Sequence, residues 1–168
     1  MVLLALALPV APARAANDAW WLTAEFATEG KSVEGLPLIA FDSSWVAASA
    51  LREDMFPPEA REKGESVAEH DGHLTLTMDL DGDHRPERAV VGVYHDSAGA
   101  AGRFLLILAQ DRRGRLRKKA LFAEPGSAGF SVLYRADATV VWSFCMECDT
   151  ACAVALEHGA LALDCDEE

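Results

Sequence analysis

The sequence predicts a mainly β protein of the α+β class, built as an antiparallel β-meander of about seven or eight strands after one short N-terminal helix. From His73 onward, apolar and polar residues alternate with a period of two. The connections between these runs are short and carry Gly, Asp or Ser, which favours antiparallel neighbours. Only one segment has helical spacing.

That segment predicts a helix over about residues 43–55. Asp42-Ser43-Ser44 is a typical helix start, and the two prolines at 57 and 58 end the run. The apolar residues between them recur at helical spacing: Trp45, Ala48, Leu51 and Met55. Residues 57–72 are charged and rich in turn formers, which predicts a solvated loop.

Strands are expected wherever β-forming residues alternate with polar ones. The first is Leu74–Met78, followed by residues 88–95. The remaining runs are 103–110, 115–122, 129–135, 138–145, 152–157 and 160–165. The four tryptophans, Trp20, Trp21, Trp45 and Trp142, are expected in or near the core.

Composition restricts the class of protein. The chain has 168 residues, 51% of them hydrophobic, and 27 Asp and Glu against 15 Lys and Arg give a net charge of -12. This length and composition fit one globular domain. The acidic balance argues against a nucleic-acid partner, because binding phosphates needs clustered positive charge.

The N-terminus predicts export. Residues 2–10 are apolar and Ala13-Arg14-Ala15 resembles a cleavage site, so residues 1–15 are interpreted as a signal peptide and residues 16–168 as a single β-rich domain. The apolar run is too short to cross a bilayer, and no later run approaches the required length, so no transmembrane segment is expected. The predicted location is periplasmic or secreted.

The most informative stretch is the acidic loop, residues 79–87, with a strand-like run on each side. Carboxylates stand at its positions 1, 3, 5 and 9, and the backbone carbonyl of Arg85 at position 7 offers another oxygen. Ca²⁺ takes six to eight oxygen ligands, which such a loop can supply. The expected ligands are therefore Asp79, Asp81, Asp83, Arg85 and Glu87.

The acidic loop is not an EF-hand, because His84 and Val90 stand where that motif needs Gly and Glu. Over residues 73–95 it resembles instead the calcium loop of FG-GAP (integrin α-chain-like) repeats, whose pattern is D-x-D-x-D-G-x-x-D. His84 replaces the glycine of that pattern and Glu87 its last aspartate. The resemblance implies a structural calcium site in a β-hairpin, with His84 in a left-handed conformation. The alternative is an acidic turn without metal.

Four cysteines in an exported chain favour disulfides. His158-Gly159 is interpreted as a two-residue hairpin loop, and counting outward from it places Cys152 opposite Cys165, which leaves Cys145 for Cys148. Two alternatives remain. Cys145 and Cys148 form a C-x-x-C motif, which would be redox-active at a helix N-terminus, and all four cysteines together could bind zinc.

Two further clusters have weaker functional interpretations. Six bases lie within eight positions, which indicates either a patch for an anionic partner or a charged edge strand protected from aggregation: Arg112, Arg113, Arg115, Arg117, Lys118 and Lys119. A second set matches no metal or acid–base motif and is expected to consist of surface residues: His70, Asp71, His73, His95 and Asp96.

These observations predict an exported, calcium-binding, non-enzymatic binding module, for example an inhibitor or immunity-type protein that meets a protein or other partner in the cell envelope. The alternative is a periplasmic enzyme. It would be either a thiol oxidoreductase that uses Cys145 and Cys148, or a calcium-assisted hydrolase.

Overall fold

The computed structural model describes residues 19–148 and 150–165, so the predicted signal peptide lies outside the described residues. The described chain folds into three antiparallel sheets. The smallest pairs β1 (Ser32–Val33) with β2 (Leu36–Pro37). The largest has the order β3 (Trp45–Ala50), β5 (Glu87–Asp96), β6 (Ala101–Gln110) and β7 (Leu116–Gly126), and β4 (Thr75–Met78) pairs with β5 on the same side as β3.

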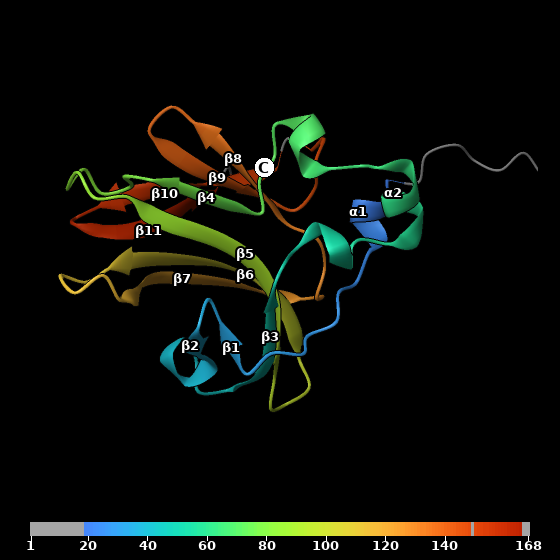
Figure 1. Cartoon of the computed structure of the whole chain (residues 1–168), viewed down its shortest axis with the longest axis horizontal. Coiled ribbons are helices and arrows are strands. Elements are labelled where there is room, and N and C mark those ends of the chain that lie inside the picture. The colour runs from blue at the N-terminus through green and yellow to red at the C-terminus, as the bar shows by residue number, and fades with distance from the viewer. Residues whose placement is uncertain (1–18, 149, 166–168) are drawn as a thin grey trace, which may run out of the picture.

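The third sheet has four strands in the order β11 (Ala160–Cys165), β10 (Ala151–Glu157), β9 (Thr139–Ser143) and β8 (Val132–Ala136). Two short α-helices, α1 (Trp20–Thr23) and α2 (Pro58–Lys63), lie at one end of the molecule (Figure 1). Three 3-10 turns complete the elements: Leu38–Ala40, Glu53–Met55 and Val67–His70. Within residues 19–148 and 150–165, every helix falls short of the length and apolar character that a membrane span requires.

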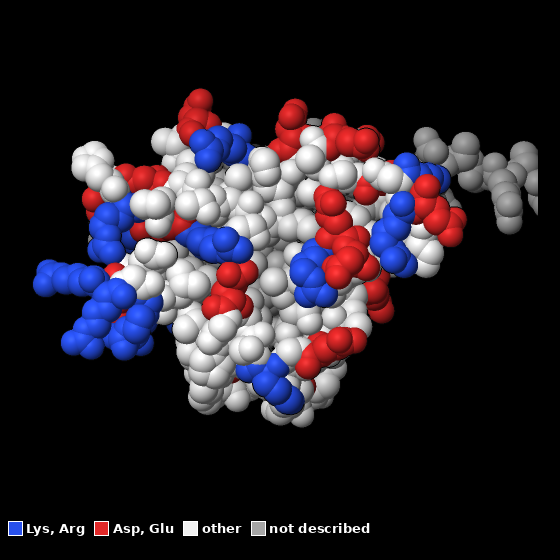
Figure 2. Space-filling model, in the orientation of Figure 1, with Lys and Arg blue, Asp and Glu red and all other residues white. Residues whose placement is uncertain are grey.

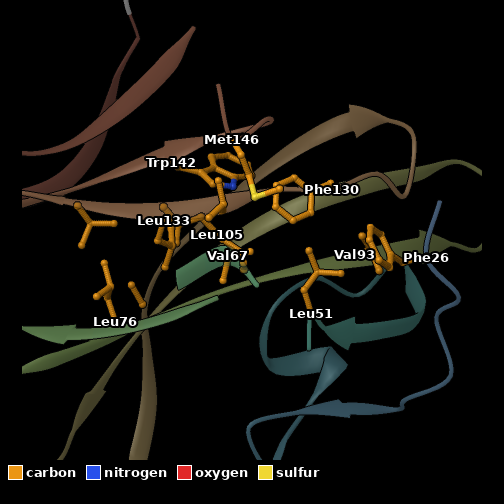
Figure 3. Packing of buried hydrophobic residues seen from close by; sticks show 14 of the residues in the cluster. Phe26, Leu51, Val67, Leu76, Val93, Leu105, Phe130, Leu133, Trp142 and Met146 are labelled. Atoms are coloured by element: carbon orange, nitrogen blue, oxygen red, sulfur yellow. The ribbon is translucent and has the colours of Figure 1, made fainter. Parts of the chain in front are cut away.

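The five-stranded sheet is the middle of three layers, with the four-stranded sheet above it and the β1–β2 hairpin below it in Figure 1. The main core lies between the two large sheets, where Val91 and Leu105 of the five-stranded sheet belong to the same buried cluster as Leu133 and Trp142 of the other. Figure 3 shows several of these side chains meeting between the layers. A smaller cluster on the opposite face includes Phe104 and Trp45, so β5 and β6 are buried on both faces. Their nearly continuous apolar sequences follow from that burial.

The predicted mainly β, antiparallel fold is confirmed, but the strand count and the single meander are wrong. The described residues form eleven strands, because β1, β2 and β3 add to the eight predicted runs. The meander also divides into two, β5–β6–β7 and β8–β9–β10–β11, which lie in separate sheets. The two large sheets meet at His73, just before β4, and Leu133 in β8. The backbone N–H of each residue donates a hydrogen bond of 2.8 Å to the backbone carbonyl of the other.

The predicted helix over residues 43–55 is wrong, because this segment forms β3 and then a 3-10 turn. Strand β3 pairs with β5, and its register shifts between Trp45 and Ala47. The extra residue of such a bulge places Trp45 and Ala48 in the same buried cluster, although residues three apart in a regular strand face opposite ways. The bulge therefore imitates helical spacing. Asp42 caps no helix; it accepts hydrogen bonds from the backbone and hydroxyl of Ser44.

The segment predicted as a loop, residues 57–72, contains α2 and a 3-10 turn. Pro57-Pro58 begins a helix here rather than ending one, because Pro58 occupies the first helical position, where a missing N–H has no cost. Gly64 then ends α2 in a left-handed conformation with φ 73°.

Candidate metal site in the acidic loop

The acidic loop connects β4 to β5, and the two strands hold its ends together. Met78 pairs with Glu87 in the sheet, so the loop leaves and re-enters adjacent strands. Two residues inside it have left-handed backbones, Gly82 at φ 75° and His84 at φ 65°. The left-handed conformation expected for His84 is therefore present. Histidine tolerates it, though less readily than glycine.

Three carboxylates of the loop come together. Asp79, Asp81 and Glu87 each place an oxygen within 4.8 Å of the others, and this is the one group of three or more metal-ligating side chains among the described residues. Asp83, also predicted as a ligand, lies outside this group and is exposed. Its carboxylate accepts a hydrogen bond from the backbone N–H of Arg85 at 2.8 Å. The structure thus assembles three of the four predicted carboxylates.

Hydrogen bonds to backbone N–H groups orient these carboxylates. Asp79 accepts from Gly82 at 2.8 Å through Oδ1 and from His84 at 2.9 Å through Oδ2. Glu87 accepts from the backbone N–H of Leu80 at 2.8 Å through Oε2. The loop backbone therefore wraps around its own acids, with Asp79 at the centre.

Lys119 of β7 supplies the positive charge that these acids need. Its Nζ donates to Oδ2 of Asp81 and, at 2.7 Å, to Oε1 of Glu87. Glu87 is 1% exposed, and a buried carboxylate without a partner would be strongly disfavoured. The hydrogen bond from Lys119 lowers the pKa of Asp81. Burial acts to lower the pKa of Lys119, but its hydrogen bonds to Asp81 and Glu87 outweigh burial and raise that pKa.

A bulge in β7 places Lys119 there. The pairing of β6 with β7 runs from Ile107–Ala120 directly to Leu108–Lys118, so Lys119 is the extra residue. The Nζ of Lys118 donates instead to the backbone carbonyl of Phe41 at 2.9 Å. The two neighbouring lysines therefore have different partners.

A pocket of about 340 Å³ lies beside the acidic loop and the start of β7. Arg85 is one of the residues that line it, and its Nη2 donates to the backbone carbonyl of Gln110 at the end of β6. Asp83, Glu87 and Lys119 line it as well. Of the three clustered acidic residues, Glu87 lines this pocket, whereas Asp79 and Asp81 do not.

The six-residue basic run does not form one uniform patch. Lys118 and Lys119 are engaged as described above, and Arg115 and Arg117 pair with Asp111 at 2.9 and 3.6 Å. Arg112 and Arg113 are exposed at the turn between β6 and β7. Within the described residues, Arg112 and Arg113 are the two members of the run whose side chains make neither an ion pair nor a hydrogen bond.

The cysteines stand in the two predicted pairs at disulfide distance. Cys152 and Cys165 are cross-strand partners of β10 and β11, as the predicted hairpin register requires, and Cys145 pairs with Cys148. In redox-active C-x-x-C motifs, a helix that starts at the motif lowers the pKa of the reactive thiol. No helix begins in the described residues that follow Cys148. The four cysteines also do not gather into one metal-ligating group among the described residues, which removes the support for a zinc site.

The histidines and aspartates considered as a second site are not brought together in the described structure. His73 bridges to β8 through its backbone, and His95 shares a hydrogen bond of 2.9 Å between its Nδ1 and the hydroxyl of Thr28. Nδ1 of His70 lies 3.8 Å from the carboxylate of Glu147. These three histidines thus have separate partners and do not share a site.

Sequence reasoning missed the role of Lys119, which it grouped with the basic run. The lysine lies 32 residues after Glu87, and only the pairing of β5, β6 and β7 brings the two together. No spacing in the sequence indicates this contact. Comparison of the chain with protein-family models, with curated proteins and with solved structures found no match.

Proposed function

We propose that this chain is an exported binding module whose acidic loop holds a structural calcium ion. The observation that carries the proposal is the convergence of Asp79, Asp81 and Glu87 within 4.8 Å in a loop of FG-GAP-like spacing. Hard carboxylate oxygens at this density are typical calcium ligands, and without a cation they repel one another. The site lies between β4 and β5, so its effect is to brace the sheet.

Calcium and Lys119 would compete for the same carboxylates. The ammonium of Lys119 already contacts Asp81 and Glu87, so calcium binding requires that it move away. Further oxygens would come from Asp83, the carbonyl of Arg85 and water. An affinity of about 0.1 to 1 mM, as in extracellular calcium modules, is expected.

Two features support a location outside the cytoplasm. The N-terminal sequence has a signal-peptide pattern, and both cysteine pairs stand at disulfide distance, which fits an oxidising compartment. Extracellular compartments also supply calcium at the concentration that such a site needs. A rigid β scaffold would then present its loops and strand edges to a partner.

The test is thermal unfolding of EDTA-treated protein with and without calcium. For a Kd of about 0.3 mM, about 10 mM calcium stabilises by about 2 kcal/mol, which raises the Tm by about 4 to 8 °C. Asp79→Asn should lose this rise. Asp137→Asn, at an exposed turn position with φ 49°, is the matched control and should keep it. An unchanged Tm in the wild type, or equal loss in both variants, contradicts the calcium site.

A further inference from the structure

The turn between β6 and β7 carries a cluster of arginines at one end of the molecule. We call Arg112, Arg113, Arg115 and Arg117 the arginine tip; all four are exposed. In Figure 1 the β6–β7 hairpin extends toward that end, and Figure 2 shows basic side chains projecting from it into solvent. The arginine tip is therefore a projecting surface and not a groove.

Asp111 makes the support of the arginine tip rigid. Its Oδ1 accepts from the backbone N–H of Arg113 at 2.8 Å and of Arg115 at 3.0 Å, and Gly114 completes the turn at φ 74°. These backbone hydrogen bonds lower the pKa of Asp111 to about 2, so the turn keeps this form at neutral pH. Arg115 and Arg117 also pair with Asp111, whereas Arg112 and Arg113 make no ion pair in the part of the chain that the structure describes.

The acidic loop and the β6–β7 turn together are less acidic than the rest of the chain. Residues 79–87 and 110–119 hold seven of the chain's 15 Lys and Arg and five of its 27 Asp and Glu, so these two segments carry +2 in a chain of net charge -12. Salt at physiological strength screens charges beyond about 8 Å. At a surface touched by the tip, the arginines therefore dominate.

The side chains of the tip fit a phosphate-bearing surface better than a protein partner. Stable protein interfaces usually combine arginines with buried aromatic or aliphatic anchors. The large exposed hydrophobic side chains of the described chain, Leu22, Ile39, Val46 and Leu156, all lie outside residues 79–87 and 110–119. Guanidinium groups, in contrast, bind phosphate oxygens in pairs without needing apolar contact.

We propose that the arginine tip docks this protein onto bilayers that contain anionic phospholipids. The inference shares the binding role of the proposed function but does not require the calcium site. The arginines meet the headgroup phosphates, and no side chain enters the hydrocarbon. Docking is therefore reversible and sensitive to salt.

The test measures partitioning onto phosphatidylcholine vesicles with and without about 30% phosphatidylglycerol, in EDTA and at low salt. Each basic residue near an anionic surface contributes about fivefold, so Arg112→Ser/Arg113→Ser should bind about 25-fold more weakly. The control variant Arg52→Ser/Lys63→Ser removes the same charge at exposed positions elsewhere. Its binding to the anionic vesicles should stay within about twofold of the wild type. Arg112→Lys/Arg113→Lys should retain most of the binding.

Binding only to the anionic vesicles, lost in the tip variant and at about 0.5 M salt, supports the proposal. No binding by the wild type, equal loss in the tip and control variants, or binding to poly-L-glutamate but not to vesicles overturns it. A parallel series in calcium separates the two proposals. If calcium changes neither the Tm nor vesicle binding while the tip variant still binds weakly, the calcium site fails and the docking surface stands.

Discussion

Replacing Lys119 with methionine removes the ammonium that faces Asp81 and Glu87 and keeps most of the aliphatic stem. In calcium-free buffer, Glu87 then retains one partner, the backbone N–H of Leu80, and loses its ion pair. Because Glu87 is 1% exposed, water cannot replace the ammonium easily. We therefore expect Lys119→Met to destabilise the calcium-free protein.

The size of the effect follows from burial. Removing one member of a buried ion pair costs about 3–5 kcal/mol. The side chain of Lys119 is 25% exposed, which weakens its pairing, so about 2 to 3 kcal/mol is expected. For a domain of this size, that loss lowers the Tm by about 4 to 12 °C.

The assay is thermal unfolding followed by circular dichroism, in EDTA and then in calcium. Calcium should restore most of the lost stability in Lys119→Met, because the ion takes the place of the ammonium, and it should bind more tightly than to the wild type. Lys118→Met is the control: its neighbouring Nζ donates to the carbonyl of Phe41 and faces no carboxylate in the acidic loop. The control removes one hydrogen bond of an exposed side chain and leaves no buried charge unpaired, so it should lose less stability than Lys119→Met and should respond to calcium as the wild type does.

Two results would refute this reasoning. Equal stability of Lys119→Met and the wild type in EDTA would show that Lys119 does not stabilise the buried carboxylate. A large loss that calcium leaves unchanged would show that no cation replaces the ammonium in the acidic loop.

Three other predictions follow from the same structure. The pKa of Asp81 in the folded protein is below its usual value of 3.8. The ionised carboxylate therefore contributes fully to the free energy of unfolding above pH 3.8, and this contribution is lost as the pH falls through the folded-state pKa. The stability advantage of the wild type over Asp81→Asn should therefore shrink in acid below about pH 4, and an advantage that grows there contradicts the account. Replacing Cys152 and Cys165 with alanine opens a disulfide with a sequence separation of 13 and should cost about 3 kcal/mol in denaturant unfolding; no loss would argue against that bond. Gly92→Ala should destabilise strongly, because its Cβ would lie 2.2 Å from the ring of Phe104 and 2.5 Å from a backbone oxygen; an unchanged urea midpoint would show that the sheet can relax there.

Much of the sheet structure was predictable because period-two patterns and turn residues are local signals. The hairpin of β10 and β11 is the clearest case, since a two-residue loop at His158-Gly159 determines the register and places Cys152 opposite Cys165. The left-handed His84 was also predictable, from its place in the acidic loop. Such features depend on residues close together in the sequence.

The predictions that were wrong concern features that depend on tertiary structure. The bulge in β3 gives Trp45 and Ala48 the spacing of a helix, and local pattern cannot separate the two. The division of the meander happens between β7 and β8, where Ala128 and Phe130 are buried and the backbone bonds to Phe26. Periodicity does not show which sheet a strand joins. The contact of Lys119 in β7 with the acidic loop was missed for the same reason.

The most direct test of the calcium site is a calcium titration followed by two-dimensional NMR of the backbone amides. The N–H groups of Leu80, Gly82 and His84 donate to the carboxylates of Glu87 and Asp79. Their resonances should shift in a saturable way at about 0.1 to 1 mM calcium, while amides of α2, at the other end of the molecule in Figure 1, stay in place. If these three resonances do not move, or if all amides move alike, the acidic loop is not a calcium site.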